Sequence, residues 1–310
     1  MKPEILQLVP VSKSVQQELD TLYTTHASFD GFPYDHVPEN IEVLLTNGAI
    51  GASSQMIDAL PHLKLITVHG IGLDAIDLEK AKQKNIRVSI ARDSSTDDVA
   101  DIAIGLLLDI TRQISARDRH IRAGYWVTKG RYPRQGTSLT HKNVGIMGMG
   151  PIGKTIARRL MAFDMKISYT ARHCHHEVAW EFIPSLVDLA QNSDFLIIAA
   201  SGGQSSYHAV NQEVLEALGE RGFLVNIGRG SIIDEMTLVQ FLKEGKIAGA
   251  GLDVFTDEPY VPPDLFQLDN VVMTTHSASS TYETTLRSSK MVIQSIKDFY
   301  AGKDLPFSVT

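Results

Sequence analysis

The sequence is poorest in cysteine. It holds a single one, Cys174, among 310 residues, so no disulfide can form within the chain. No hydrophobic run is as long as a membrane-spanning helix requires, and residues 1–10 contain no apolar segment of signal-peptide length. We therefore expect a cytoplasmic protein with no membrane partner.

An excess of basic residues is missing as well. The chain has 29 Lys and Arg against 36 Asp and Glu, which gives a formal net charge of -7. It therefore has no general electrostatic attraction for nucleic acid, and we expect no nucleic-acid partner. Hydrophobic residues make up 43% of the chain, as in ordinary globular proteins, and the length of 310 residues favours two domains over one.

Strand and helix patterns alternate along the chain, which favours parallel sheets and the α/β fold class. A long helix is expected over residues 97–122, a surface loop over 124–136, and a final amphipathic helix over 280–300. The final helix is expected to return to the first domain. The expected domains are residues 1–98 together with about 285–310, and residues 99–284. Strands are predicted at residues 5–9, 41–45, 65–68, 86–88, 144–147, 166–169, 195–199, 223–227, 248–252 and 271–273.

Residues 142–160 read KNVGIMGMGPIGKTIARRL, an apolar run followed by three spaced glycines and a helical pattern. This is the strand, turn and helix order of the dinucleotide-binding motif G-x-G-x-x-G. Gly148 permits the sharp turn, Gly150 lets a pyrophosphate approach bare backbone, and Gly153 lets the helix pack closely on the sheet. We therefore predict a Rossmann-like dinucleotide-binding domain. Its phosphate-binding turn comprises Gly148, Met149, Gly150, Pro151, Ile152 and Gly153.

The end of the next predicted strand indicates which dinucleotide is bound. An acidic residue at this position would bind both ribose hydroxyls of NAD, but the strand ends in Thr170, Ala171 and Arg172. A guanidinium group can pair with the 2′-phosphate of NADP instead. We therefore expect NADPH to be preferred, with NADH still possible. The alternative is that Arg172 is an ordinary solvated arginine.

A cluster of three histidines and the only cysteine follows directly, at residues 173–176. Adjacent residues cannot easily converge on one tetrahedral metal ion, and the usual ligand spacings are absent. We expect no metal site here, and interpret the segment as an exposed loop beside the adenosine end of the cofactor.

An arginine, a carboxylate and a histidine follow three later strands. In open α/β sheets, ligands bind at the edge formed by the carboxyl ends of the strands. Taken singly, these residues could be a surface cation, a solvated loop charge and a buried histidine. Their placement at one edge favours a catalytic site instead. The residues are Arg229 in VNIGRG (225–230), Glu258 in GLDVFTDEP (251–259) and His276 in THSA (275–278).

In order and spacing, these segments resemble the D-isomer-specific 2-hydroxyacid dehydrogenase family over essentially the whole chain. HGIGLDAID at 69–77 is similar to the family's substrate loop, and TDDVADIAIGLLL at 96–108 to its crossover helix. The strand ending in Arg172 is similar to the glyoxylate, hydroxypyruvate and hydroxyphenylpyruvate reductase branch. Four features depart from the family pattern. Thr275 replaces a usual proline, SASS at 277–280 replaces a glycine-containing turn, Ala171 stands where Ser or Gly is common, and the second Arg or Lys often found near His175 is missing.

The resemblance implies two Rossmann-like domains, the first flavodoxin-like, with the active site in the cleft between them. It implies reduction of a 2-oxo acid by hydride transfer. His276 would be the proton donor, Glu258 its partner, and Arg229 the group that binds the substrate carboxylate. The implied substrate-binding residues are His69, Gly70, Ile71, Gly72, Arg229 and His276. The further implied cofactor contacts are Ile227, Gly228, Arg229, Asp253, His276 and Ser277, with Asp253 on the nicotinamide carboxamide.

Two alternatives stay open at this point. One is an NAD-linked member of the same family, such as a phosphoglycerate or D-lactate dehydrogenase. The other is a dinucleotide-sensing co-repressor built on the same fold, which fold alone does not exclude. The resemblance also implies a homodimer, formed through the cofactor domain and residues 126–134.

Overall fold

The computed structural model describes residues 2–309, and the chain divides into two units. One comprises the residues up to Ser95 together with those from Ser280 onward, and the other comprises Thr96–Ser279. The sequence placed these divisions at residues 98/99 and about 284/285. None of the helices in the described part of the chain combines the length and apolar character needed to cross a membrane.

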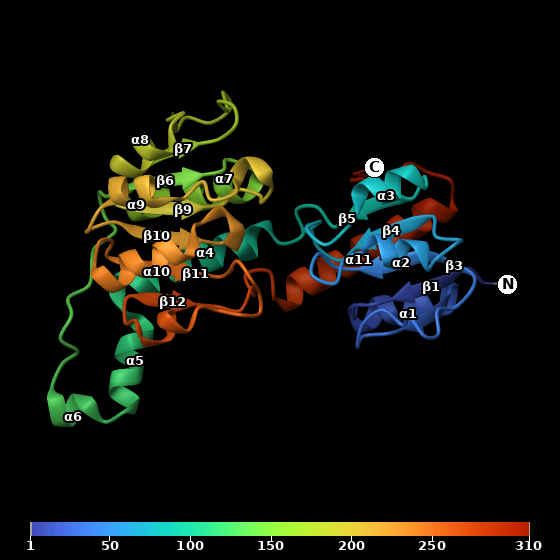
Figure 1. Cartoon of the computed structure of the whole chain (residues 1–310), viewed down its shortest axis with the longest axis horizontal. Helices are drawn as coiled ribbons and strands as arrows, with labels where there is room; N and C mark the ends of the chain where they lie inside the picture. Colours follow the sequence, from blue (N-terminus) through green and yellow to red (C-terminus); the bar gives the residue numbers. More distant parts are fainter. Residues whose placement is uncertain (1, 310) are drawn as a thin grey trace. The chain divides into compact units, whose positions relative to one another are not determined.

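The first unit is built on a five-stranded parallel sheet in the order β2-β1-β3-β4-β5, the flavodoxin-like order (Figure 1). Apolar residues of β1, β3 and β4 are buried, and Ile293 and Ile296 of the final helix pack on one face of the sheet. The strands are β1 (Glu4–Gln7), β2 (Thr24–Ala27), β3 (Ile41–Thr46), β4 (Leu65–Val68) and β5 (Arg87–Ile90). The helices are α1 (Lys13–Leu22), α2 (Ser54–Asp58), α3 (Leu78–Gln83) and α11 (Tyr282–Tyr300).

The second unit holds a seven-stranded parallel sheet in the order β12-β11-β10-β9-β6-β7-β8. Strand order reverses between β6 and β9, so the crevice in which such sheets bind dinucleotides opens at the end of β6. The strands are β6 (Asn143–Met147), β7 (Lys166–Thr170), β8 (Glu181–Phe182), β9 (Phe195–Ile198), β10 (Phe223–Asn226), β11 (Gly249–Leu252) and β12 (Val271–Met273). The helices are α4 (Thr96–Arg112), α5 (Ile114–Arg122), α6 (Tyr125–Lys129), α7 (Pro151–Leu160), α8 (Leu186–Gln191), α9 (Gln212–Leu218) and α10 (Glu235–Glu244).

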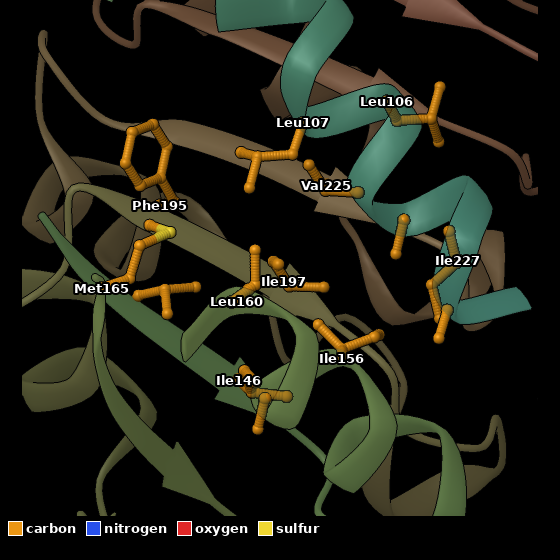
Figure 2. Packing of buried hydrophobic residues seen from close by; sticks show 14 of the residues in the cluster. Leu106, Leu107, Ile146, Ile156, Leu160, Met165, Phe195, Ile197, Val225 and Ile227 are labelled. Carbon is orange, nitrogen blue, oxygen red and sulfur yellow. The ribbon is translucent and has the colours of Figure 1, made fainter. Parts of the chain in front are cut away.

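Helices α4 and α7 cover one face of this sheet and bury a continuous apolar core (Figure 2). Leu107 of α4 and Leu160 of α7 point toward Phe195 and Ile197 of β9, and all four are fully buried. Burial of each such side chain contributes roughly 1.5–3 kcal/mol. A second core, under α8, α9 and α10, covers the opposite face. The sheet that carries the candidate site is therefore buried on both faces.

The structure corrects two expectations about the segment after α4. The helix expected over residues 97–122 is interrupted at Gln113, which has left-handed backbone geometry with φ 58°, so α4 and α5 are separate helices. The carboxylate of Asp109 accepts a 2.8 Å hydrogen bond from the Ser115 amide and stabilises this break. The segment expected as a loop contains α6, and α5 and α6 extend away from the sheet of this unit (Figure 1).

Candidate active site

The glycine turn after β6 has the close approaches that the motif requires. Gly148 has φ 101°, and a Cβ there would lie 2.7 Å from the Ala200 backbone nitrogen. A Cβ on Gly153 would lie 2.0 Å from the Gly148 carbonyl oxygen. A Cβ on Gly150, by contrast, would meet nothing within 4 Å, and no side chain caps α7, which begins at Pro151. The open backbone at the start of α7 thus fits a pyrophosphate group.

The side chain of Met149 and the amide of Gly148 are already engaged within the fold. Met149 is buried, so only its backbone is available to a ligand. The amide of Gly148 donates a 2.8 Å hydrogen bond to the Thr170 carbonyl and so ties the turn to the end of β7. The Thr170 hydroxyl itself donates to the Pro184 carbonyl at 3.2 Å and is engaged within the fold.

Ala171 and Arg172 come directly after β7, beside the glycine turn. The Arg172 side chain is exposed and has no hydrogen-bond or ion-pair partner among residues 2–309. Of the histidines that follow, His175 is held by Glu177. No group of three metal-ligating side chains that could hold an ion occurs among the described residues.

Asn226, at the end of β10, shapes the turn that carries Arg229. Its fully buried side chain accepts a 3.0 Å hydrogen bond from the Gly228 amide and donates one of 3.0 Å to the Arg229 carbonyl. The Arg229 guanidinium donates to the Gly228 carbonyl at 2.8 Å. A Cβ on Gly230 would lie 1.9 Å from the backbone of Phe255, so the arginine turn packs directly on the segment after β11.

That neighbouring segment carries Glu258, which contacts His276. Glu258 Oε1 accepts a 3.0 Å hydrogen bond from the Phe255 amide, and Glu258 Oε2 lies 2.7 Å from His276 Nδ1. Because a carboxylate only accepts hydrogen bonds, Nδ1 must be the donor, and the Nε2 atom is left to face a ligand. The structure thus pairs the predicted glutamate and histidine, and it packs the turn that carries the predicted arginine on the segment between β11 and Glu258.

Asp253, the first residue after β11, fixes the segment around His276. One carboxylate oxygen accepts hydrogen bonds from the Thr274 hydroxyl at 2.6 Å and the Ser277 amide at 2.9 Å. The other accepts from the Ala278 amide at 3.1 Å. The Asp253 carbonyl also accepts from the His276 amide at 2.8 Å. His276 has φ 50°, an uncommon value for a residue other than glycine, and this network holds it there.

In the other unit, the predicted substrate loop follows β4. The His69 ring lies 3.2 Å from the Ser289 hydroxyl of α11, and its desolvation by burial lowers the pKa of His69. The imidazole is therefore engaged within this unit rather than presented to a ligand. The backbone amides of Gly70, Ile71 and Gly72 have no hydrogen-bond partner among residues 2–309.

A cavity of about 300 Å³ opens beside the His276–Glu258 pair. Its walls are mostly apolar, with Phe255, Phe266 and Met273 facing it. The sequence did not predict this cavity because residues 259–267, several of which line it, form only a loop and one short 3-10 helix (Pro263–Gln267) and carry no periodic pattern.

The fold and the glycine turn define a dinucleotide-binding protein, and the paired histidine and glutamate at the same sheet edge define a dehydrogenase. Comparison with known proteins leads to the family. Residues 104–278 match the model of the D-isomer specific 2-hydroxyacid dehydrogenase NAD binding domain.

Two curated relatives and one solved structure match nearly the whole chain. The 2-ketogluconate reductase of Gluconobacter oxydans (strain 621H) is 40% identical over 98% of this chain and 97% of its own. The hydroxyphenylpyruvate reductase of Plectranthus scutellarioides is 40% identical over 97% of both chains. The NADPH-dependent glyoxylate/hydroxypyruvate reductase of Sinorhizobium meliloti, solved with NADP and malonate, superposes with a TM-score of 0.93 at 34% identity, covering 100% of this chain and 97% of that one.

The chain therefore belongs to the D-isomer specific 2-hydroxyacid dehydrogenase family. It is an NAD(P)-dependent 2-hydroxyacid dehydrogenase, and the expected α/β fold with two parallel sheets is confirmed.

Proposed function

We propose that the protein reduces a small 2-oxo acid to the D-2-hydroxy acid, with NADPH as the preferred cofactor. The observation that carries this proposal is the 2.7 Å contact between His276 Nδ1 and Glu258 Oε2, at the sheet edge that also holds Arg229. Relatives named as reductases of 2-oxo acids support it.

Each of the three residues has a distinct role in the proposed reaction. When bound, the reduced nicotinamide supplies the hydride that goes to the carbonyl carbon of the substrate. His276 donates a proton from Nε2 to the carbonyl oxygen, since Nδ1 is held by Glu258. Glu258 also stabilises the positive charge of the ring. Arg229 binds the substrate carboxylate and offsets the negative charge that develops on the carbonyl oxygen.

The cofactor is held, in this proposal, by the glycine turn and by the strand ends next to it. The open backbone at Gly150 receives the pyrophosphate. Ile227, Gly228 and Ser277 line the nicotinamide half. An ionised carboxylate has about four acceptor positions, and the fold uses three of those on Asp253. Because this carboxylate is buried, the proposed part of Asp253 in cofactor binding is to hold Ser277 and His276 in place beside the nicotinamide.

A second set of donors for the substrate carboxylate is proposed at the turn after β4. The amides of Gly70, Ile71 and Gly72 are open, and successive open N–H groups form a concave site for an anion. His69 contributes through its backbone, because its ring is bound to Ser289.

The preference for NADPH rests on Arg172. Its guanidinium is exposed and unpaired among the described residues, directly after the strand whose end is expected to lie beside the adenosine ribose. No carboxylate occupies residues 170–172 to bind the ribose hydroxyls or repel a phosphate. The Arg172→Ala variant should therefore bind NADPH more weakly, with NADH binding little changed.

The apolar cavity beside His276 favours an aryl pyruvate among the substrates that the sequence left open. An aromatic ring placed against Phe266 and Met273 would lose contact with water, whereas glyoxylate has no side chain to place there. Phe266→Ala should lower kcat/KM for 4-hydroxyphenylpyruvate roughly tenfold while leaving glyoxylate nearly unchanged. Tyr260→Ala, at an exposed tyrosine of the same segment that does not line the cavity, is the matched control.

The first experiment follows absorbance of the reduced nicotinamide, with NADPH and NADH in parallel. The substrates are glyoxylate, hydroxypyruvate, 4-hydroxyphenylpyruvate and 2-ketogluconate. Faster oxidation of NADPH supports the proposal, and faster oxidation of NADH would favour the NAD-linked alternative. No turnover by folded protein that binds NADPH would favour the co-repressor. His276→Gln should retain NADPH binding and lose most of the reduction rate; an active variant would rule His276 out as the proton donor.

A homodimer is part of the same proposal, formed through α5 and α6. These helices extend from the sheet of their unit (Figure 1), and Trp126 and Val127 on α6 are 60% and 94% exposed. Apolar side chains this exposed on a projecting segment are typical of a protein interface. Light scattering should give twice the monomer mass, and Val127→Asp should give a monomer. A parent protein that is monomeric at micromolar concentration would contradict this arrangement.

A further inference from the structure

The loop between β7 and Glu177 is held rigidly at both ends. At its start, the Thr170 carbonyl accepts a 2.8 Å hydrogen bond from the Gly148 amide of the glycine turn. Further along the loop, the His175 amide donates a 2.8 Å hydrogen bond to the hydroxyl of Tyr169, a fully buried residue of β7. Lys154 of α7 contacts Glu177 at 2.5 Å and ends the segment. The backbone between these points therefore has a fixed position beside the cofactor turn.

Most of the titratable groups around this loop are already paired. Glu177 binds both Lys154 and, at 2.9 Å, the His175 ring. The hydrogen bond from Lys154 is the largest cause that lowers the pKa of Glu177 to about 2, so Glu177 stays ionised at neutral pH. The Cys174 thiol lies 3.8 Å from the Tyr169 hydroxyl and 3.9 Å from His176 Nδ1.

Arg172 and His173 differ from these paired groups. Both side chains are exposed, and neither has a hydrogen-bond or ion-pair partner among residues 2–309. They are consecutive residues one step beyond Ala171, next to the glycine turn. The loop thus carries an arginine and a histidine on consecutive exposed residues, where a dinucleotide fold binds the adenosine ribose.

We propose that His173 is a second, proton-dependent contact for the 2′-phosphate of NADPH, so that the preference for NADPH over NADH increases as the pH falls from 9 to 7. This inference rests on the NADPH preference proposed for Arg172. A protonated imidazole donates a charge-assisted hydrogen bond to a phosphate oxygen, and histidine is the side chain that loses its charge near neutral pH. Arg172 keeps its charge throughout, so it provides a contact that does not depend on pH.

The size and range of the effect follow from linkage. A phosphate contact that raises the pKa of an imidazole by about one unit changes affinity by up to about tenfold between the protonated and neutral forms. The 2′-phosphate itself loses its second proton near pH 6, so below pH 7 its own titration opposes that of the imidazole. Above pH 7 the phosphate is dianionic, so any further change in affinity with pH comes from groups of the protein.

The test measures binding of the adenosine end alone, by calorimetric titration of the full chain at pH 7 and pH 9. The two probes are 2′,5′-ADP and 5′-AMP. Because both carry the 5′-phosphate, the ratio of their dissociation constants isolates the 2′-phosphate. The ratio is the dissociation constant of 5′-AMP divided by that of 2′,5′-ADP. With an ordinary imidazole pKa near 6.5 raised by about one unit, the parent ratio should fall about threefold from pH 7 to pH 9.

Variants of the loop separate the histidine from its neighbours. The ratio of dissociation constants should be low at both pH 7 and pH 9 for His173→Gln. It should be high at both pH values for His173→Lys. His176→Gln and Cys174→Ser are the matched controls and should behave as the parent does. Cys174→Ser is needed because cysteine thiols ordinarily titrate near pH 8.5.

Two results would overturn the inference about His173 while leaving the NADPH preference intact: a parent ratio that favours 2′,5′-ADP equally at both pH values, or a His173→Gln variant that keeps the full pH dependence. A third result has a different meaning. If 2′,5′-ADP binds no better than 5′-AMP at either pH, both the NADPH preference and this inference fail.

Discussion

Asp253 should control both the stability of the cofactor unit and the activity of His276. The carboxylate is buried and accepts three hydrogen bonds, from the Thr274 hydroxyl and from the amides of Ser277 and Ala278. These bonds hold the segment that places His276 at φ 50°. Asp253→Ala removes all three bonds, Asp253→Asn replaces one acceptor with a donor that would face the Ala278 amide, and Thr274→Val removes only the hydroxyl bond.

The expected losses in the free energy of unfolding are graded. A hydrogen bond to a charged group contributes about 1.5–3 kcal/mol, and a buried donor left unpaired costs about 1–3 kcal/mol. Three such bonds amount to at least about 4.5 kcal/mol, so we expect Asp253→Ala to cost about 4.5 kcal/mol or more, Asp253→Asn about 2–3 kcal/mol and Thr274→Val about 1.5 kcal/mol. For a unit of 150–250 residues, 1 kcal/mol lowers Tm by roughly 2–4 °C. A loss of about 4.5 kcal/mol should therefore lower the Tm of Asp253→Ala by about 9–18 °C.

Activity should follow the same order, because a displacement of about 1 Å at a catalytic group can cost about 10²-fold in rate. We expect Asp253→Ala to lose about 10²-fold in kcat at saturating NADPH, and Thr274→Val only a few-fold. Thermal unfolding followed by circular dichroism and initial rates with one 2-oxo acid measure both quantities. The reasoning is refuted if Asp253→Ala melts within about 1 °C of the parent and keeps its kcat within twofold.

Three further predictions concern other parts of the fold. Arg229→Lys should lower kcat/KM for a 2-oxo acid by about 10²-fold, because an ammonium group cannot form the paired hydrogen bonds of a guanidinium; a change of only a few-fold would exclude the carboxylate-binding role. In Gly153→Ala the new Cβ would lie 2.0 Å from the Gly148 oxygen, so fluorescence titration should show weakened NADPH binding together with a stability loss of about 1–3 kcal/mol. The pKa of Glu177 is lowered from 4.5 to about 2, so its contact with Lys154 stabilises the fold above pH 4.5 and is lost as the pH falls toward 2. Glu177→Gln should therefore lower Tm by a small and constant amount between pH 6 and 9, where the contact is present in the parent, and approach the parent Tm toward pH 2; an acid dependence of Tm like that of the parent would contradict this.

Local sequence was enough for the elements that depend on short-range pattern. The strand expected at residues 65–68 is β4, and the one expected at 271–273 is β12, because each is a short apolar run bounded by polar or turn residues. The glycine motif predicted the turn after β6, since the need for positive φ at Gly148 and for close packing at Gly153 is written in the residue types themselves. Arg229, Glu258 and His276 could be placed at one edge because parallel strands all end there.

Other features depend on contacts between residues far apart in the chain. The break at Gln113 is set by the Asp109 side chain and leaves the apolar spacing on either side intact, so periodicity predicted one long helix. The short strands β2 and β8 lie at the edges of their sheets and have few buried residues, so no hydrophobic run marks them.

The candidate site also combines features that local sequence predicts with features that depend on long-range contacts. Residue types and their spacing along the chain were enough to predict which side chains reach the sheet edge and that a dinucleotide is bound beside them. The contacts made on folding commit Asn226 to shaping the arginine turn, Asp253 to shaping the histidine turn, and the His69 ring to Ser289. A carboxylate or imidazole has the same sequence signature whether it meets a ligand or a backbone amide. Its role is decided by which donors the folded chain brings to it.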